Sequence, residues 1–471
     1  MAYQYDIILK NGIVVDPVNN RKGDFDVGIA DGKIKDVSYD LDPALALDCF
    51  DLNGLYVLPG IIDLHVHASA WIGGRFAHKM MAQAGVTTAL DMSGPIESVL
   101  DIARDFGVGL NLACVQYLRP GYTVTDTNPS KAELKDLLDV SLAAGAIGFK
   151  ILGGHYPLTP QASATAIDVV NENGSYIAMH VGTTETDSNI EGLYEALELA
   201  NGKSIHIAHI NSYCRGGVRD YMTETEEALN AIAKNPNISC ESYLSLINGT
   251  SAKCADGYLE SKATARCLEE GGFDATEQGM EDAILSGWAQ ISVESGGTTI
   301  LASGKKGLNW WNNKKTDTTV SFDVNPPVPR IRLVTAKDES DKFVVDCIST
   351  DGGGIPRNSI VPMGLGLVKL QAIDINDFVV KTSRNPAGIL GLKNKGHLSL
   401  GADADITVVD LERQKPYMSL GNGKMISYRG YVCGQGTHII TTPRGEAHVK
   451  EKGLQAIVVD PSESPFLKRR Q

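Results

Sequence analysis

Short hydrophobic runs broken by turn residues dominate the first 51 residues of the chain and recur near its C-terminus. The runs lie at 6–10, 13–16, 26–29, 404–410, 425–428 and 431–433. Asn11-Gly12 and Asp31-Gly32 interrupt the early runs, and such dipeptides favour tight hairpin turns. The pattern predicts antiparallel strands at both ends of the chain, which we expect to meet in one accessory β-domain.

The pattern changes between residues 59 and 399, because apolar runs of strand length now alternate with helical stretches such as 131–144 and 191–200. Eight β/α repeats of this kind predict an α/β fold, a (β/α)8 TIM barrel, with functional residues at the carboxyl ends of its strands. The eight apolar runs are 60–65, 86–90, 110–114, 146–150, 176–180, 204–209, 238–243 and 343–348.

These patterns divide the chain into two predicted domains. Residues 1–58 and 400–471 form the accessory β-sandwich, and residues 59–399 form the barrel. The connection between the seventh and eighth runs is unusually long, which favours an inserted β-rich flap around 296–323 that contains Trp310-Trp311.

Composition and charge narrow the choice of partners. The chain of 471 residues is 43% hydrophobic and carries a net charge of −14, from 43 basic and 57 acidic residues. Such a chain repels phosphate backbones and anionic lipids, so we expect neither nucleic acid nor membrane binding. Eight scattered cysteines without a CxxC pair, and no signal peptide in 1–10, favour a soluble cytoplasmic protein with reduced thiols.

Candidate chemistry begins with His65 and His67, which end the first apolar run of the barrel. Residues two apart in a strand point to the same face, so both imidazoles can reach one metal ion. Such a pair alone is often just two solvated histidines at a strand end. Further polar residues end other predicted strands, however: Lys150, His180, His209 and Asp351.

Several motifs together resemble the amidohydrolase superfamily of metal-dependent hydrolases, over nearly the whole chain. They are Pro59-Gly60-x-x-Asp63-x-His65-x-His67, Gly85-Val-Thr-Thr88, Gly148-Phe-Lys150, His180, His209, Ser349-Thr-Asp351-Gly352, and the segments 385–391, 395–399 and 401–405. The resemblance implies six metal ligands: His65, His67, Lys150, His180, His209 and Asp351.

These ligand types favour two divalent ions, with Zn²⁺ as the expected metal. A lysine in an apolar strand has a disfavoured ammonium, so Lys150 is expected to add CO₂ and bridge the ions as a carbamate. The alternative is a strand-end lysine that reaches solvent. His206 also lies in the sixth run, but we interpret it as structural because only His209 adjoins the polar loop after that run.

Asp351 is expected both to bind a metal and to move the proton of the metal-activated water to the leaving nitrogen. Tyr156, in the loop after Lys150, resembles the tyrosine that holds the developing oxyanion in related hydrolases. Arg215, Arg357 and Arg75 lie on loops after strands six, eight and one, where a guanidinium can bind a substrate carboxylate, although each is alone more often a surface charge.

Within the superfamily, the lysine on the fourth strand favours a two-metal enzyme that hydrolyses an amide C–N bond of a small molecule. The phrase Gly145-Ala-Ile-Gly-Phe149 and Tyr156 are closer to deacylases of N-acyl amino acids. Cyclic amide or ureide hydrolases, such as dihydroorotase and hydantoinase, are the alternative. Two positions depart from these branches. D-Aminoacylases usually have a cysteine where this chain has Asp91-Met92, and dihydroorotases usually have an arginine where it has Ala68-Ser69. A non-catalytic scaffold is a third hypothesis. The resemblance also implies a homo-oligomer, a dimer or a tetramer.

Overall fold

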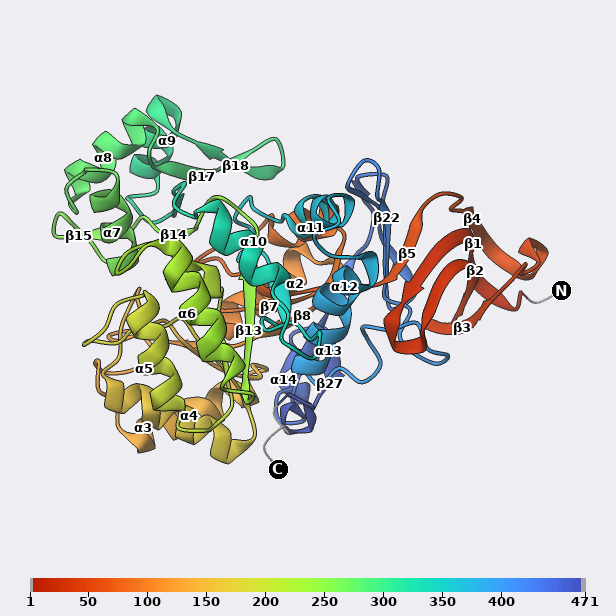
Figure 1. Ribbon diagram of the computed structural model, residues 1–471, viewed down its shortest axis with the longest axis horizontal. Helices are drawn as coiled ribbons and strands as arrows, with labels where there is room; N and C mark the ends of the chain where they lie inside the picture. The colour runs from red at the N-terminus through yellow and green to blue at the C-terminus, as the bar shows by residue number, and fades with distance from the viewer. Residues whose placement is uncertain (1–2, 467–471) are drawn as a thin grey trace.

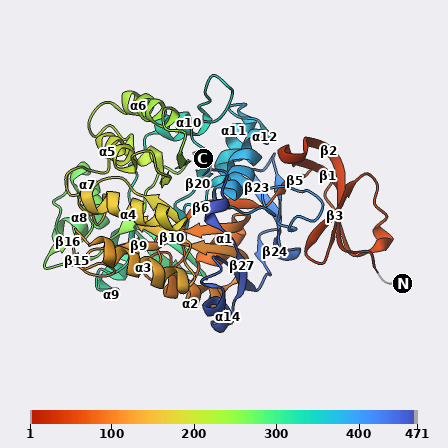
Figure 2. The same ribbon diagram turned by 90° about the horizontal axis from the view of Figure 1, so that it is seen from below.

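Parallel strands wrapped by helices occupy the middle of the computed structural model, which describes residues 3–466 (Figure 1). A mixed sheet that contains the N-terminal strands lies at one end of the molecule. A group of helices and short strands formed by residues 250–321 lies at the opposite end, as the view from below also shows (Figure 2).

The parallel strands are β6 (Ile61–His67), β7 (Val86–Asp91), β8 (Val108–Cys114), β9 (Gln116–Leu118), β10 (Gly148–Ile151), β11 (Tyr176–Met179), β12 (Ile205–Ile207), β13 (Ile238–Tyr243), β20 (Cys347–Ser349) and β21 (Gly352–Gly353). Hydrogen bonds join β6, β7 and β8 in one sheet and β9 to β13 and β20 in the next. Only Val115 separates β8 from β9, and β21 pairs with β6. This order of pairings is the one expected of a (β/α)8 barrel, and each predicted apolar run overlaps one of these strands.

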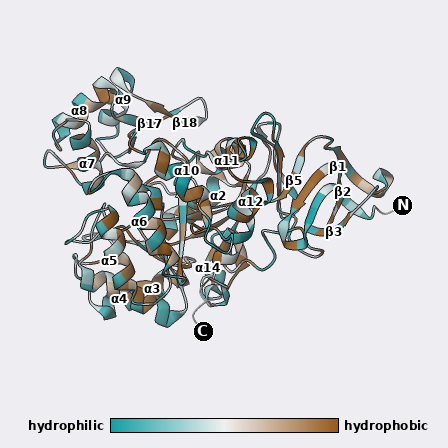
Figure 3. Ribbon diagram, in the orientation of Figure 1, coloured by the Kyte–Doolittle hydropathy of each residue, from teal (hydrophilic) through white to brown (hydrophobic). Residues whose placement is uncertain are grey.

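Helices connect the parallel strands: α1 (Ala77–Gln83), α2 (Ile96–Phe106), α3 (Lys131–Ala143), α4 (Pro160–Asn173), α5 (Ile190–Ala200), α6 (Tyr221–Ala233), α10 (Pro327–Thr335), α11 (Ile360–Lys369), α12 (Ile375–Val379) and α13 (Asn385–Ile389). Ser130, Thr159 and Asn189 accept backbone N–H hydrogen bonds at the starts of α3, α4 and α5, which satisfies donors that a helix leaves free. Hydrophobic and hydrophilic residues alternate along the outer helices (Figure 3). This pattern gives a helix one apolar face, which packs on the strands.

The mixed sheet contains β1 (Tyr5–Asp16), β2 (Arg21–Ala30), β3 (Lys33–Ser38), β4 (Ala46–Asp51), β5 (Tyr56–Pro59), β22 (Ile406–Asp410), β23 (Lys415–Gly421), β24 (Lys424–Tyr428) and β25 (Tyr431–Val432). Most pairs are antiparallel, as the sequence predicts, but β4 and β5 both pair in parallel with β1. Antiparallel pairing of β5 with β22 joins strands from the two ends of the chain. The strands form one nine-stranded hydrogen-bonded sheet, and its core includes Leu9, Val27 and Ile406, each fully buried.

The remaining C-terminal elements, β26 (Gly436–Thr441), α14 (Glu446–Glu451) and β27 (Gln455–Val458), differ from the predicted domain division. β26 pairs in parallel with β8, so these residues extend a sheet of parallel strands rather than the mixed sheet. Ile439 and Ile440 explain the difference, because both are buried in core clusters that contain side chains of the parallel strands.

The insertion between β13 and β20 is larger than the predicted flap. It contains β14 (Thr250–Ser251), β15 (Cys254–Ala255), β16 (Tyr258–Leu259), α7 (Lys262–Glu270), α8 (Glu277–Ser286), β17 (Gln290–Ser295), β18 (Thr298–Ala302), α9 (Gly304–Asn313) and β19 (Thr319–Ser321). Trp310 and Trp311 lie in helix α9, not in a β-rich flap. Gly307 and Trp311 are buried four residues apart, a helical spacing, and Trp311 packs in a separate core with Ile284 and Phe322.

Short helical segments of other types are η1 (Pro17–Asn19), η2 (Pro43–Leu45), η3 (Ile210–Tyr213), η4 (Val380–Arg384) and η5 (Pro461–Glu463). No helix among residues 3–466 combines the length and the hydrophobicity that a membrane crossing requires. All eight cysteines are free thiols, as the sequence predicts.

A buried ionic network connects the mixed sheet to the parallel strands. Asp405 accepts hydrogen bonds from Lys395 Nζ at 2.7 Å, from Asn111 Nδ2 of β8 at 2.8 Å and from the backbone N–H of Asn422 at 2.7 Å. The side chains of Lys395 and Asp405 are each 2% exposed, and Asp403 lies 3.0 Å from the same ammonium. Removing one charge from such a buried pair is costly, because the other remains desolvated.

We therefore expect Asp405→Asn to lower the free energy of unfolding by about 3–5 kcal/mol, the usual cost of breaking a buried ion pair. The measurement is chemical denaturation at neutral pH. The exposed i,i+4 pair of Glu446 and Lys450 provides the control, since Glu446→Gln should change the free energy of unfolding by less than about 0.5 kcal/mol. An equally small loss for Asp405→Asn would contradict the proposed role of the network.

Candidate metal centre

Six polar side chains of the predicted ligand set line one cavity at the carboxyl ends of the parallel strands. His65 and His67 end β6, Lys150 lies in β10, and His180, His209 and Asp351 follow β11, β12 and β20. The cavity has a volume of about 50 Å³, and all six side chains contribute to its wall. This convergence follows from the fold, because parallel strands around a barrel end at one face.

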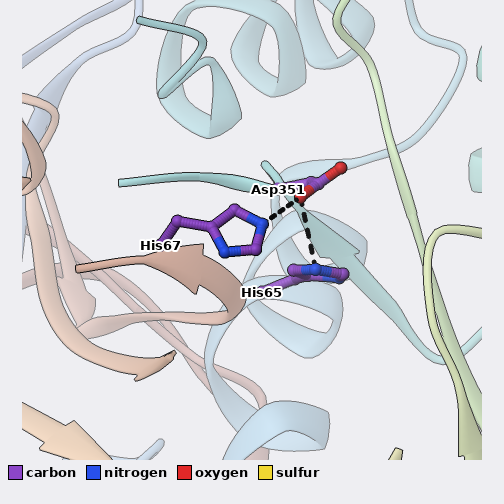
Figure 4. Close-up of side chains that lie close together, drawn as sticks. All are labelled: His65, His67 and Asp351. Carbon is purple, nitrogen blue, oxygen red and sulfur yellow. Dashed lines mark hydrogen bonds and ion pairs between the residues drawn. The ribbon is translucent and has the colours of Figure 1, made fainter. Parts of the chain in front are cut away.

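His65, His67 and Asp351 lie close together at this face (Figure 4). The Nε2 atoms of His65 and His67 lie 3.2 Å and 2.9 Å from the same carboxylate oxygen, Oδ1 of Asp351. The Nδ1 atoms are engaged elsewhere, at 2.7 Å from Glu241 Oε1 and 3.1 Å from Ser93 Oγ. When Nδ1 donates in both rings, both Nε2 lone pairs face an anionic oxygen, an arrangement that a metal cation stabilises.

His180 and His209 form a second donor pair in the same cavity. His180 Nδ1 lies 3.0 Å from His209 Nε2, and Nδ1 of His209 is buried without a hydrogen-bond partner among residues 3–466. Burial lowers the pKa of both imidazoles well below the usual value. Both rings are therefore neutral at pH 7, which is the protonation state that binds a divalent metal.

Lys150 is buried in the wall of the same cavity. Its ammonium has no carboxylate within 4.0 Å among the described residues, and the sulfur of Met92 lies 3.8 Å from Nζ. Burial lowers the pKa of Lys150 to about 8, although the charges of Glu241 and Asp351 oppose the shift. A larger share of neutral amine than in an exposed lysine follows, and the neutral amine is the form that reacts with CO₂.

Glu241 of β13 is a site residue that the sequence analysis missed. Its Oε1 accepts hydrogen bonds from His65 Nδ1 at 2.7 Å and from the backbone N–H of His209 at 2.8 Å, and Ser349 donates to Oε2. Burial favours the protonated acid, but the neighbouring histidines outweigh it and lower the pKa of Glu241 to about 2. A glutamate within a predicted buried strand was the available signal, since glutamate is almost never fully buried without a partner.

Arg357, a predicted substrate-binding residue, contacts Asp351. Its Nη2 lies 2.5 Å from Asp351 Oδ2, its Nε donates to the Asp351 carbonyl oxygen at 2.5 Å, and its side chain is fully buried. The ion pair with Arg357 and the nearby histidines outweigh the effect of burial and hold the pKa of Asp351 well below its usual value. Asp351 is therefore an oriented carboxylate at neutral pH.

The other predicted residues occupy different surroundings. Tyr156 lines the cavity of the six side chains, and its buried hydroxyl has no hydrogen-bond partner among the described residues. Arg215 lines an adjoining cavity of about 340 Å³. Arg75 pairs with Glu294 of the insertion at 2.7 Å and lines neither cavity. His206 points to Ser239, with Nδ1 3.0 Å from Oγ, and also lines neither cavity.

Comparison with known proteins gives an independent assignment. The family model described as "Amidohydrolase family" matches residues 56–245 and 328–435. The unmatched stretch between these ranges contains the insertion. A dihydroorotase from Geotalea daltonii is 25% identical over 430 residues, which cover 86% of this chain and 89% of that protein.

Two solved structures share the fold at low sequence identity. An N-acyl-D-glutamate deacylase from Bordetella bronchiseptica, complexed with zinc and a phosphonate inhibitor, has a TM-score of 0.67 at 15% identity and covers 92% of this chain and 99% of its own. A D-aminoacylase described by its binuclear metal centre has a TM-score of 0.66 at 16% identity, with the same coverage of both chains. The family model matches more than half of the sequence, and the chain therefore belongs to the amidohydrolase family.

Proposed function

We propose that this chain is a metal-dependent hydrolase that cleaves the amide C–N bond of an N-acyl amino acid. The convergence of two imidazole pairs, one lysine and one carboxylate on a single cavity carries the proposal. Membership of the amidohydrolase family supports hydrolysis of a C–N bond. We further expect a soluble cytoplasmic homo-oligomer, a dimer or a tetramer, that acts on a small molecule.

The donor set fits two divalent ions such as Zn²⁺, which binds imidazole nitrogen and carboxylate oxygen. His65, His67 and Asp351 would hold one ion, and His180 and His209 the other. Lys150 would bridge them after its neutral amine adds CO₂ and releases a proton to give a carbamate anion. The ions would supply Lewis acidity, polarising the amide carbonyl and lowering the pKa of water.

The protein's own residues would then orient the groups and move the proton. Asp351, fixed by Arg357, accepts a proton from the attacking water and donates it to the departing nitrogen. Tyr156, which lines the cavity, donates its hydroxyl to the carbonyl oxygen as negative charge develops there. Burial raises the pKa of Tyr156, which keeps this hydroxyl protonated at neutral pH.

Hydrolysis of a cyclic amide or ureide is the second candidate, and the similarity to a dihydroorotase favours it. The adjoining cavity of about 340 Å³ favours a linear substrate, because it leaves room for an amino-acid portion beside the reacting amide. A non-catalytic scaffold is the least supported candidate, since all six predicted metal ligands line the cavity.

We expect the purified protein to contain two divalent ions per chain and Lys150→Ala to retain at most one, because the bridging anion is lost. Hydrolysis should fall at least 100-fold and recover in part with added short carboxylic acids, which replace the carbamate. Metal analysis and amide turnover measure these effects, with Lys203→Ala, an exposed ion-pair residue, as the control. Two retained ions with full activity in Lys150→Ala would contradict the carbamate.

A second prediction concerns Asp351→Asn. Turnover of an amide should fall about 100-fold or more, the usual effect of losing a general acid and base, because the nitrogen must be protonated before it leaves. An activated ester with the same acyl group should lose less, since an alkoxide leaves more readily. Equal losses, at full metal content, would mean that Asp351 acts only as a ligand.

A third prediction concerns Glu241, which we propose as the positioning residue for His65. Glu241→Gln should weaken metal binding about 10- to 100-fold, the usual effect of removing a carboxylate behind a metal-binding histidine. Competition with a chelator measures the affinity, and exposed Glu226→Gln is the matched control. Unchanged affinity in Glu241→Gln would rule out this role.

A further inference from the structure

The adjoining cavity of about 340 Å³ shares part of its wall with the candidate metal centre. His180, His209 and Asp351 line both cavities. On its other side the larger cavity is lined by residues of helix α7 in the insertion, including Arg266 and Glu270. A substrate at the metal centre would therefore extend into a chamber formed jointly by the barrel and the insertion.

Arg215 is a cation in this chamber whose hydrogen-bond partners are all neutral. Its Nε donates to Asn325 Oδ1 at 2.9 Å, and its Nη2 donates to Ser212 Oγ at 3.2 Å and Tyr243 OH at 3.3 Å. Among residues 3–466, no carboxylate lies within 4.0 Å of its guanidinium, and Nη1 has no hydrogen-bond partner. Asn325, Ser212 and Tyr243 are buried, so they hold the guanidinium in a fixed position.

Other charged groups of the chamber are placed differently. Arg266 forms an ion pair with Asp187. Asp351 is paired with Arg357. Glu270 is the remaining acid of the lining, and it lies beyond ion-pair distance of Arg215. Arg215 and Glu270 attract each other across the chamber, but no carboxylate of the described residues lies within ion-pair distance of Arg215. A partly buried guanidinium without a directly bound acid attracts an anion.

Arg215 lies near the proposed metal ligand His209, both along the chain and in space. It follows His209 by six residues, through the turn η3 that contains Ser212. Tyr243 connects the two, because its hydroxyl contacts Arg215 while its ring centroid lies 6.2 Å from that of His209. The side chain of Tyr243 therefore lies between the guanidinium and a proposed metal ligand. One small molecule can span this separation, with one end at the guanidinium and the other at the metal ligands.

We propose that Arg215 binds the free carboxylate of the substrate, so that the enzyme acts on N-acyl amino acids and discriminates against neutral amides. The inference rests on the proposed function and narrows its substrate class. The uncharged acyl end then lies toward Trp71, Ile72 and Leu152, apolar residues that line the smaller cavity beside the metal ligands. Hydantoins and other amides without an anionic group lack the partner that Arg215 requires.

The test compares matched substrates: N-acetyl amino acids of both chiralities and the same compounds with the carboxylate converted to a carboxamide. Arg215→Met should lower kcat/KM for the carboxylates about 10- to 100-fold, mainly through KM, which matches the loss of a charged hydrogen bond. The carboxamides should change less than about threefold. Arg215→Lys should recover part of the difference, because it restores the charge without the planar fork.

Arg332→Met is the matched control, since Arg332 forms an exposed ion pair with Glu226 on helix α6 and lines neither cavity. Thermal unfolding of each variant separates a local effect from misfolding. If Arg215→Met does not fold, the native enzyme and Arg215→Lys are compared instead. The ratio of carboxylate to carboxamide turnover in these two proteins then tests whether Arg215 binds the carboxylate. Equal turnover of the two substrate series by the native enzyme would overturn the role of Arg215 while leaving amide hydrolysis intact.

Binding distinguishes this proposal from the proposed function itself. Calorimetry with N-acetyl amino acids measures affinity without any turnover. The native protein could bind these compounds and lose the binding in Arg215→Met, yet hydrolyse no amide of either series. That result would support the anion site and contradict the proposed hydrolase function. An absence of binding to the native, metal-loaded protein would overturn the anion site.

Discussion

The desolvation of charge at the carboxyl ends of the parallel strands is the constraint on which the candidate site depends. A buried ion is tolerated only when an opposite charge and hydrogen bonds compensate it. Glu241 meets this condition through His65, His209 and Ser349, and Asp351 through Arg357 and His67. These pairings hold the side chains in defined positions around the cavity.

The same constraint explains why the insertion matters. The open face of a barrel is exposed to water, which weakens every electrostatic interaction there. The insertion covers part of that face and is fastened to barrel loops by ion pairs such as Arg119 with Glu260 and Arg75 with Glu294. Its separate core around Trp311 makes it a stable wall. The wall supplies one side of the larger cavity and lowers the exposure of the charges inside it.

The sequence predicted the parallel strands well, because their apolar runs and the polar residues that end them are both local patterns. His65, His67, Lys150, His180, His209 and Asp351 converge as the strand ends require. The insertion and the C-terminal strands were harder to predict. Their cores depend on contacts between distant residues, as when Ile439 packs beside strand β8, and no local period encodes such contacts.

Glu241 shows a different limit. One of its hydrogen bonds joins it to a histidine 176 positions earlier in the chain, and the sequence around a single carboxylate in a strand does not identify such a partner. A buried glutamate must nevertheless have one, so burial is the missing information. Once the strand is placed inside the barrel, the alternation of side chains directs Glu241 inward, and the pairing follows.

Arg215 and Arg357 show why the role of a charged loop residue needs the structure. Both follow a barrel strand, both carry the same group, and the sequence assigns them the same role. In the fold, Arg357 lies against Asp351, so its charge is compensated and it serves to orient that carboxylate. Arg215 donates hydrogen bonds only to neutral oxygens and lines a cavity without a carboxylate of the described residues at ion-pair distance. The difference lies in the position of the nearest acid, which three-dimensional packing alone determines, and it separates a positioning arginine from one that is available to a ligand.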